Sequence, residues 1–493
     1  MAQVLNDQEI ARRGKLEKLR ELGVDPYGKR FDRTDTTETV KEKCANLSNE
    51  ELDAAQIYVK VAGRLLANRC MGKAAFVNIQ DKFGSIQAYV GKDIIGETAY
   101  QVYKLCDIGD VIGLYGRVMK TRTGELTIRV EEFIFLTKSL KVLPEKYHGL
   151  TDTEERYRKR YLDLIVNEDS RKTALLRPQI IRCMQSYFDS LGFVEVETSC
   201  LSPILGGANA KPFVTHHNAL DKDFYLRIAT ELNLKRLIVG GLEKVYEIGR
   251  LFRNEGIDTK HNPEFTTVEL YEAFGDLASM RDICEGVIRK CAKEVIKKDV
   301  FEWNGFTIDV SQPFRWKSMT ELVKEKTGID FSENISYEEA VKLANERHIK
   351  VEPHMTGVGH ILNAFFEEYC EEDLIQPTFV YGHPIEISPL TKKSADPRFT
   401  ERFELYMGGV EFANAYSELN DPIDQRERFE AQLKAKELGD EEASELDEDF
   451  LEALEYGMPP TGGIGIGIDR LCMFLTENNS VREVILFPTM KDR

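Results

Sequence analysis

The sequence lacks closely spaced cysteine pairs and long apolar runs. Its nine cysteines are scattered from Cys44 to Cys472 without a C-x-x-C pair. An odd number of separated cysteines suits free thiols in a reducing compartment, and structural zinc is not expected. No apolar stretch approaches the roughly 20 residues that cross a bilayer, and residues 8–22 have the pattern of a charged helix rather than a signal peptide. We therefore expect a cytoplasmic protein that does not enter a membrane.

The chain also lacks an excess of positive charge. Its formal net charge of -18 argues against nucleic-acid binding by the whole surface, because such binding depends on neutralising phosphates with Lys and Arg. A local basic or aromatic site stays open. The 493 residues exceed the roughly 250 to 300 at which a single core stops growing, so at least two domains are expected.

Residues 51–143 have a pattern of short β-rich segments that predicts an OB-type barrel. A longer connection separates the third of five segments from the fourth, which suits that fold. The five segments are residues 57–65, 75–80, 85–90, 111–119 and 126–136. Residues 1–50 are predicted to be a helical extension, and residues 144–165 a linker that leads into a helix.

Two aromatic side chains lie beside amides on one face of the expected barrel. Phe76 shares a face with Asn78, and in the next segment Gln87 shares a face with Tyr89. Aromatic rings on OB barrels stack on the bases of single-stranded nucleic acid, which amides can read. Packing of either ring under the N-terminal helices explains the pattern equally well. The barrel alone is therefore weak support for a function.

Residues 166–493 predict an α+β fold. Helical segments such as residues 171–190 alternate with strand pairs up to Pro488, without the regular βαβ rhythm of a doubly wound sheet. This favours an antiparallel sheet flanked by helices. Residues 275–376 are richer in helical pattern and are predicted to be an insertion within this domain.

A long β-hairpin is predicted from two segments of this domain, residues 244–255 and 264–274. Period-2 alternation places Arg253 and Glu255 on one face of the first strand. The same alternation gives the second strand a face that carries Phe265, Glu269 and Tyr271. If the two faces coincide, one surface combines an arginine with carboxylates and aromatic rings.

That hairpin surface has the chemistry of a nucleotide site. Arg253 can bind a carboxylate or phosphate through two hydrogen bonds, and Phe265 can stack on a purine ring. The connecting loop, with Gly256 and His261, can close over phosphates. A charged, solvated sheet face remains the alternative for any isolated pair of Arg and Glu.

A glycine-rich segment with the pattern G-x-G-x-G-x-D-R runs from Gly463 to Arg470 and leads into a predicted helix. Alternate glycines leave one strand face bare, so a ligand can approach the backbone closely. Arg470 then lies at the helix start, where anions bind well. A dinucleotide-binding loop is a poor alternative, because the spacing is not G-x-G-x-x-G.

Two carboxylates are predicted to face each other in a hairpin. A tight turn centred on Met407 and Gly408 would place Glu404 directly opposite Glu411, which is destabilising without a counter-ion. Oxygen ligands beside a phosphate site indicate Mg²⁺, which keeps waters and uses one or two protein carboxylates. If the hairpin is exposed to solvent, the two glutamates do not indicate a metal site.

Taken together, these segments resemble a class II aminoacyl-tRNA synthetase of the lysyl-tRNA synthetase kind, in class IIb. The resemblance covers nearly the whole chain. Residues 192–203 are similar to the family's first motif, which forms part of a homodimer interface. Residues 253–265 look like its second motif and residues 463–470 like its third. The order and spacing of the three motifs make the resemblance specific.

The resemblance implies roles for individual residues. Arg253, which would bind the α-phosphate and the amino-acid carboxylate, and Arg470, which would contact the γ-phosphate, would be the catalytic residues. The residues that match the ATP site are Arg253, Glu255, His261, Asn262, Phe265, Glu404, Glu411, Gly467 and Arg470. Glu404 and Glu411 match the family's magnesium ligands. The positions that match anticodon contacts are Phe76, Gln87 and Glu125.

Lysine specificity is implied by four local segments, residues 206–213, 229–232, 269–271 and 414–421. A substrate with two ammonium groups needs several carboxylates. The implied lysine-binding residues are Gly207, Glu231, Arg253, Glu269, Tyr271, Asn414, Tyr416 and Glu418. Tyr416 stands where relatives often have phenylalanine, a conservative departure.

The resemblance implies that the chain activates L-lysine with ATP and transfers it to tRNA(Lys), as a homodimer with Mg²⁺. No side-chain nucleophile is required for either step. One rival is a relative that charges aspartate or asparagine, which would need a cationic group facing the substrate side chain, and the sequence carries no such signature. The other is a non-catalytic RNA-binding protein built on a decayed synthetase.

Overall fold

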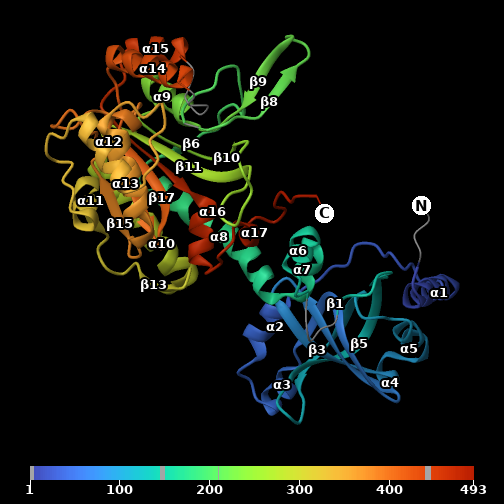
Figure 1. Ribbon diagram of the computed structural model, residues 1–493. Coiled ribbons are helices and arrows are strands. Elements are labelled where there is room, and N and C mark those ends of the chain that lie inside the picture. Colours follow the sequence, from blue (N-terminus) through green and yellow to red (C-terminus); the bar gives the residue numbers. More distant parts are fainter. Residues whose placement is uncertain (1–4, 145–149, 209, 439–445, 493) are drawn as a thin grey trace. The chain divides into compact units, whose positions relative to one another are not determined.

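The computed structural model describes residues 5–144, 150–208, 210–438 and 446–492 (Figure 1). They form two compact units. One contains the chain up to Arg156 together with Tyr161–Arg171, and the other contains Tyr157–Arg160 and Lys172–Arg493. Part of the expected linker, residues 145–149, lies outside the described residues. Within the part of the chain that is described, no helix combines the length and apolarity needed to span a bilayer.

The first unit contains a closed five-stranded barrel in the order β1-β2-β3-β5-β4. Its strands are β1 Tyr58–Met71, β2 Ala74–Asp81, β3 Gly84–Gly91, β4 Val111–Lys120 and β5 Leu126–Thr137. The longer connection between β3 and β4 contains α4 (Lys92–Ile95) and α5 (Glu97–Lys104). Alternation buries Val77 and Ile79 completely inside the barrel. The predicted OB-type barrel is confirmed.

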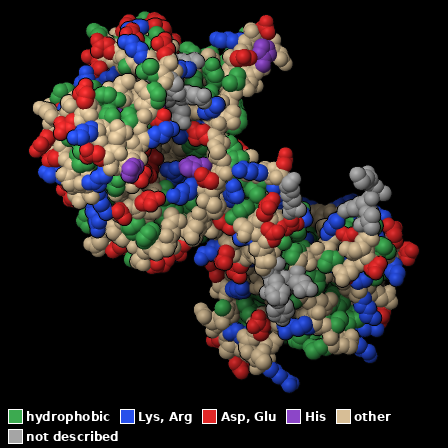
Figure 2. Space-filling model, in the orientation of Figure 1, with side chains coloured by type: hydrophobic (Ala, Val, Ile, Leu, Met, Phe, Trp, Pro, Cys, Tyr) green, Lys and Arg blue, Asp and Glu red, His purple; other side chains and the backbone are tan. Residues whose placement is uncertain are grey.

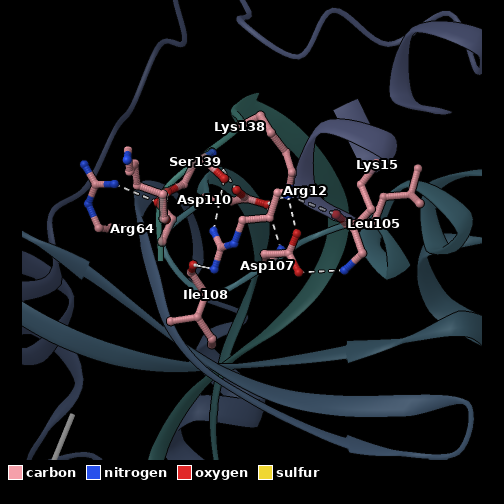
Figure 3. Close-up of polar contacts among 11 residues, drawn as sticks. Arg12, Lys15, Arg64, Leu105, Asp107, Ile108, Asp110, Lys138 and Ser139 are labelled. Carbon is pink, nitrogen blue, oxygen red and sulfur yellow. Dashed lines mark hydrogen bonds and ion pairs between the residues drawn. The ribbon is translucent and has the colours of Figure 1, made fainter. Parts of the chain in front are cut away.

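Three helices precede the barrel: α1 Asp7–Glu21, α2 Thr37–Cys44 and α3 Asn49–Ala55. A network of polar contacts holds α1 against the barrel (Figure 3). Arg12 donates hydrogen bonds to the carbonyls of Ser139 (3.0 Å) and Ile108 (2.9 Å). The buried Lys138 ammonium lies 2.7 Å from both Asp107 and Asp110. Because every member of this network has a partner, the buried charges are compensated.

The second unit is built on an eight-stranded sheet in the order β14-β15-β16-β17-β18-β11-β10-β6. Its strands are β6 Val194–Glu195, β10 Lys244–Phe252, β11 Glu264–Ala273, β14 Arg315–Ser318, β15 Thr378–Tyr381, β16 Arg402–Met407, β17 Val410–Ser417 and β18 Thr461–Gly467. The strands from β15 to β10 pair antiparallel, as predicted. Only the two outermost pairings, β14 with β15 and β10 with β6, are parallel. The sheet is therefore mixed at its edges.

Helices cover one face of this sheet, and the central strands line a cavity on the opposite face. The covering helices are α8 Glu168–Ser190, α10 Leu277–Cys291, α16 Ile468–Leu475 and α17 Val481–Val484. Their apolar side chains, such as Met184 and Phe474, join Val268 and Ile466 of the sheet in one buried core. A second group consists of α9 Glu231–Val239, α14 Pro422–Glu437 and α15 Glu448–Glu455. These helices pack together, and α9 also packs against β10 and β11 in a separate core.

The segment 275–376 is divided between two cores. Its helices α11 Met319–Thr327, α12 Tyr337–Glu346 and α13 Val358–Tyr369 share a core of their own, whereas α10 packs into the main core. The extent of the helical insertion stays a prediction. The remaining elements are α6 Thr153–Arg158, α7 Arg160–Val166, β7 Leu201–Ser202, β8 Val214–His217, β9 Lys222–Leu226, β12 Val300–Trp303 and β13 Phe306–Asp309. The β8–β9 hairpin projects from the unit (Figure 1).

Candidate active site

A cavity of about 440 Å³ lies on the face of the sheet opposite the main helical core. Strands β10, β11, β16, β17 and β18 contribute to its lining, together with the start of α9 and of α16. Acidic, basic and histidine side chains gather around a hollow in this unit (Figure 2). A concave site with converging charged groups is the expected place for ligand binding.

The predicted hairpin is formed by β10 and β11, and Arg253 follows the first strand rather than lying within it. Strand β10 ends at Phe252, so the prediction that Arg253 and Glu255 occupy a strand face is wrong. The backbone N–H of Arg253 still donates to the Pro263 carbonyl (2.8 Å). The ladder stops there because Pro263 has no N–H to return the bond. Arg253 nevertheless lines the cavity, as do Phe265, Glu269 and Tyr271 from β11.

The Arg253 guanidinium has an unused donor. Its carbon lies 5.1 Å from the centre of the Phe265 ring, a cation–π contact that fixes the side chain at the cavity wall. Its buried Nε has no hydrogen-bond partner among the described residues. A buried donor without a partner costs free energy, so this nitrogen suits an anionic ligand. The role of Arg253 stays a prediction.

The other predicted residues of the hairpin loop differ in what holds them. His261 is exposed, with Nδ1 2.8 Å from Asp258 and Nε2 3.5 Å from Arg470. Asn262 is buried and already committed, because it donates to the Glu264 carbonyl (2.7 Å) and accepts from the backbone of Thr489 (3.2 Å). The Asn262 side chain therefore shapes the loop. Glu255 is exposed and lines the cavity.

Strand β18 supplies the bare glycine face that the sequence predicted. Gly463, Gly465 and Gly467 all line the cavity, and α16 begins directly after them. Arg470 donates to the Glu411 carbonyl (2.7 Å), and its guanidinium lies 3.4 Å from the Glu411 carboxylate. A cation is thus held at the cavity wall beside an acidic side chain.

Glu404 and Glu411 lie on the cavity side of the β16–β17 hairpin, but they are not directly opposite each other. Glu411 pairs with Tyr406, and Glu404 pairs with Asn414. The turn is formed by Gly408 and Gly409, whose φ angles of 59° and 69° suit a two-residue hairpin turn, so it lies one position later than predicted.

A β-bulge at Phe412 explains why both carboxylates still reach the cavity. Leu405 pairs with Ala413 while Tyr406 pairs with Glu411, so Phe412 is an extra residue in β17. The bulge shifts the alternation by one residue. Glu411 and Asn414 therefore line the cavity together, although three positions separate them.

Burial and nearby carboxylates raise the pKa values of two acidic side chains at this hairpin, Glu411 and Glu371. Burial, followed by the charge of Glu404, raises the pKa of Glu411. Burial and neighbouring carboxylates raise the pKa of Glu371 to about 7. Glu404 accepts hydrogen bonds from Arg402 and from the Tyr406 hydroxyl, each 2.7 Å long. Such mutual repulsion is what a bound cation would relieve.

The donor set fits Mg²⁺ bound with phosphates. Among the described residues, no group of three or more His, Cys, Asp or Glu is arranged to hold a metal by itself. Mg²⁺ commonly takes only one or two protein carboxylates and completes its shell with water and phosphate oxygens. Glu404 and Glu411 provide two carboxylates beside Arg470, which suits that arrangement.

Four of the predicted lysine-binding residues, Glu231, Glu269, Tyr271 and Tyr416, form an acidic pocket in the cavity. Glu231 begins α9 and accepts a hydrogen bond from the Tyr416 hydroxyl (3.0 Å). Glu269 accepts a hydrogen bond from the backbone of Thr230 (3.3 Å) and another from the Tyr271 hydroxyl (3.4 Å). Burial raises the pKa of Glu269 to about 7, with a further contribution from Glu231.

Two further predicted residues, Gly207 and Asn414, line the same cavity. Gly207 has a φ of 90°, and a Cβ there would lie 3.1 Å from Ala229. Asn414 accepts a hydrogen bond from Arg402 Nε (3.0 Å). Asn209, in the segment that suggested lysine specificity, lies outside the described residues.

Comparison with known proteins decides the family. A family model described as tRNA synthetases class II (D, K and N) matches residues 152–491, and one described as an OB-fold nucleic acid binding domain matches residues 59–136. The chain belongs to the class II tRNA synthetases. It is 56% identical over 488 residues to the lysine–tRNA ligase of Streptococcus thermophilus, covering 99% of this chain and 98% of the relative. It is equally similar to the lysine–tRNA ligase of Listeria monocytogenes, 56% identical over 490 residues with 99% and 98% covered.

Sequence reasoning missed one residue of this class II synthetase, Lys235. Its ammonium lies 2.5 Å from Glu231 and forms an ion pair with Glu418, and all three side chains are buried. Unlike Glu231, neither Lys235 nor Glu418 lines the cavity itself. The four-residue spacing of Glu231 and Lys235 on a helix was a visible signal for an ion pair. Nothing in the local sequence indicated that Glu418 would join it.

The synthetase's barrel keeps its predicted aromatic pair together. The Phe76 and Tyr89 rings are 5.3 Å apart at their centroids, and each is half-buried. Gln87 is buried and accepts a hydrogen bond from the Thr127 hydroxyl (3.0 Å), while Glu125 is exposed before β5. The roles of these residues stay predictions.

Proposed function

We propose that this synthetase is a lysine–tRNA ligase. The observation that carries the proposal is one cavity in which an unpartnered arginine donor, on Arg253, lies with a buried acidic pocket that contains Glu231 and Glu269. L-lysine has one carboxylate and two ammonium groups, so it matches both parts. The names of the relatives support the same substrate.

The reaction has two steps in this one cavity. The lysine carboxylate attacks the α-phosphorus of ATP, the bond to the β-phosphate oxygen breaks, and lysyl-adenylate and pyrophosphate form. A hydroxyl of the 3′-terminal ribose of tRNA(Lys) then attacks the lysyl carbonyl carbon, and AMP leaves. Neither step needs a side-chain nucleophile, so positioning and charge stabilisation are the contributions of the protein.

Individual residues have distinct tasks in the proposal. Arg253 aligns the lysine carboxylate with the α-phosphate, and Phe265 stacks on adenine. Arg470 binds the γ-phosphate, near His261. Mg²⁺, held by Glu404 and Glu411, would neutralise phosphate charge when bound. The remaining ATP contacts are assigned to Glu255, Asn262 and Gly467.

The barrel is proposed to bind the tRNA anticodon through Phe76, Gln87 and Glu125. A homodimer is proposed because the segment that resembles the first family motif contains exposed apolar residues, with Val194 55% and Leu201 42% exposed. A cytoplasmic location is proposed because all nine cysteines are free, which suits a reducing compartment.

The deciding experiment is ATP–pyrophosphate exchange with each of the twenty amino acids, with magnesium and without tRNA. Exchange with lysine alone supports the proposal. Exchange with aspartate or asparagine instead would overturn the pocket assignment, and no exchange with any amino acid would favour the RNA-binding rival.

The matched pair Arg253→Ala and Arg250→Ala tests the proposed site. Arg250 lies on the same hairpin but is 47% exposed and pairs only loosely, at 3.5 Å, with Glu264. We expect loss of at least about 100-fold in exchange rate for Arg253→Ala, the scale seen when one charge-stabilising donor is removed. Arg250→Ala is expected to stay within about twofold, because exposed pairs contribute little.

A further inference from the structure

Lys235 is a buried cation that the reaction itself does not use. Its side chain is fully buried, and its Nζ lies 5.8 Å from the centre of the Tyr416 ring. Of the two carboxylates around it, Glu231 lines the cavity and belongs to the acidic pocket of the proposed function, whereas Glu418 lies behind the cavity wall. An internal lysine is therefore bound by a residue that also belongs to the substrate pocket.

Stability alone is a weak reason for this arrangement. Removing two or three charges from water costs several kcal/mol per ion, and well-packed apolar side chains often replace buried ion pairs without loss. The Lys235 cluster is built from one helix and the segment after β17, which are far apart in the sequence. A functional reason is therefore worth testing.

The geometry divides the oxygen atoms of the two carboxylates. Glu231 contacts Lys235 through Oε1 and accepts the Tyr416 hydroxyl bond through Oε2. Glu418 contacts Lys235 through Oε2, while its Oε1 has no hydrogen-bond partner among the residues that the structure describes. That free oxygen lies against Gly463, a residue of the cavity wall. One oxygen of Glu418 is thus anchored and the other is directed toward the bare glycine strand.

The cluster also matches the charge of the proposed substrate. Two buried carboxylates, on Glu231 and Glu269, line the pocket, and a third, on Glu418, lies directly behind it with the buried ammonium of Lys235. With all four ionised the net charge is two negatives, which balances the two ammonium groups of lysine. Arg253 separately balances the substrate carboxylate.

We infer that Lys235 is a positioning residue for the amino-acid pocket: a fixed internal cation that orients Glu231 and Glu418 and sets the pocket charge to match a diammonium substrate. The inference rests on the proposed function. Lys235 stays in place when substrate binds, since it is fully buried behind the cavity wall and its partner Glu231 lies one turn away on the same helix.

Loss of this cation should make the pocket titrate at higher pH. Buried carboxylates that lose a counter-ion take up protons instead of remaining charged, so their pKa rises. The ionisable groups that face the cluster from the surrounding elements are Glu231, Arg253, Glu269, Tyr271, Arg402, Tyr416 and Glu418. A protonated carboxyl binds an ammonium group poorly, so lysine affinity would return only above the raised pKa.

The test is the pH dependence of lysine-dependent pyrophosphate exchange in Lys235→Met. At pH 7 we expect the KM for lysine to rise about tenfold or more and to fall toward the wild-type value by pH 9, because one pKa unit corresponds to a tenfold change. The KM for ATP is expected to change less than about twofold, since the ATP residues keep their contacts. An equal loss at every pH, or a loss in kcat alone, would overturn the inference.

The control is Lys138→Met in the barrel. Lys138 is also fully buried and also contacts two carboxylates, Asp107 and Asp110, so it matches Lys235 in chemistry but not in place. It should leave the pH profile of exchange unchanged. If the wild-type enzyme does not activate lysine at all, the proposed function fails, which is a different result from an unshifted profile in Lys235→Met.

A double variant keeps the inference testable if Lys235→Met does not fold. Lys235→Met with Glu418→Gln removes one positive and one negative charge, so the pocket keeps its net charge. Glu418→Gln alone lowers the net charge to one negative. If Lys235 sets the pocket charge, the KM of the double variant for lysine should therefore be lower than that of Glu418→Gln alone. A KM for lysine that is about tenfold higher in the double variant than in Glu418→Gln would contradict the inference.

Discussion

Gly463 lies so close to Tyr271 that a Cβ atom at position 463 would come within 2.5 Å of ring atom Cε1. The two residues are directly paired between β18 and β11. A glycine at this position therefore does more than open the cavity to a ligand. It makes room for the aromatic ring that covers the acidic pocket.

Gly463→Ala is expected to destabilise the protein and weaken lysine binding together. Overpacking a close contact costs about 1–3 kcal/mol, and we expect the melting temperature to fall by roughly 3 to 8 °C. Gly465→Ala is the matched control, because its Cβ would lie 3.6 Å from Glu269, an ordinary contact distance. Thermal unfolding without ligands should separate the two variants. Equal melting temperatures would show that Tyr271 and the Glu418 carboxylate, which also lies against Gly463, can move aside at little cost.

Lysine binding should strengthen as the pH rises through neutrality. Burial raises the pKa of Glu269 to about 7, so this carboxyl is mostly protonated at pH 6 and mostly charged at pH 8. The KM for lysine is expected to fall roughly tenfold between these values, following the ionised fraction. Exchange kinetics at constant ionic strength measure this, and Glu269→Gln should remove most of the change.

The raised pKa of Glu269 also makes the stability of the ligand-free protein fall as the pH rises, whereas lysine binding strengthens. A carboxyl whose folded pKa lies above its unfolded value contributes stability below the unfolded pKa, and this is lost as the pH rises through about 7. The ligand-free enzyme should therefore lose this contribution between about pH 4.5 and 8. Added lysine should raise the melting temperature more at pH 8 than at pH 6. An equal rise at both would count against a charged Glu269 in the complex.

The sequence-based predictions succeeded where hydrophobic alternation decides the structure. The five barrel strands begin and end within a few residues of the predicted segments, except that β1 continues to Met71. Alternation also predicted the cavity face of β11, because Phe265, Glu269 and Tyr271 follow one another at even spacing. Regular strands leave a period-2 pattern that a single sequence can show.

The predictions failed where one residue breaks the regular pattern. Pro263 ends the β10–β11 ladder before Arg253, and the bulge at Phe412 changes which residues of β17 face the cavity. Lys235 was missed because its pairing with Glu418 depends on the tertiary fold rather than on spacing. Most of the site residues that the family resemblance implied in this unit line the cavity, with Glu418 as an exception, and their roles stay predictions.

Removal of one carboxylate of the proposed Mg²⁺ site should act on ATP rather than on lysine. Glu411→Gln removes one of the two proposed Mg²⁺ carboxylates, the one beside Arg470, while keeping the shape of the side chain. We expect the Mg²⁺ concentration for half-maximal exchange to rise about tenfold or more, since Mg²⁺ relies on one or two protein carboxylates. Exposed Glu372→Gln is the control from the same acidic neighbourhood. An unchanged Mg²⁺ requirement in Glu411→Gln would exclude it as a ligand.

Truncation of Phe76 should separate tRNA binding from amino-acid activation. Loss of one base-stacking ring typically costs about 1–3 kcal/mol, so the KM for tRNA(Lys) should rise roughly 5- to 150-fold in Phe76→Ala. Lysine-dependent exchange without tRNA should not change. Tyr58→Ala is the matched control, because Tyr58 also belongs to an aromatic pair on the barrel, with Tyr115 at 5.6 Å, but lies on β1 rather than on β2. If the two variants lose aminoacylation equally, the effect is on barrel stability and the anticodon assignment of Phe76 is wrong.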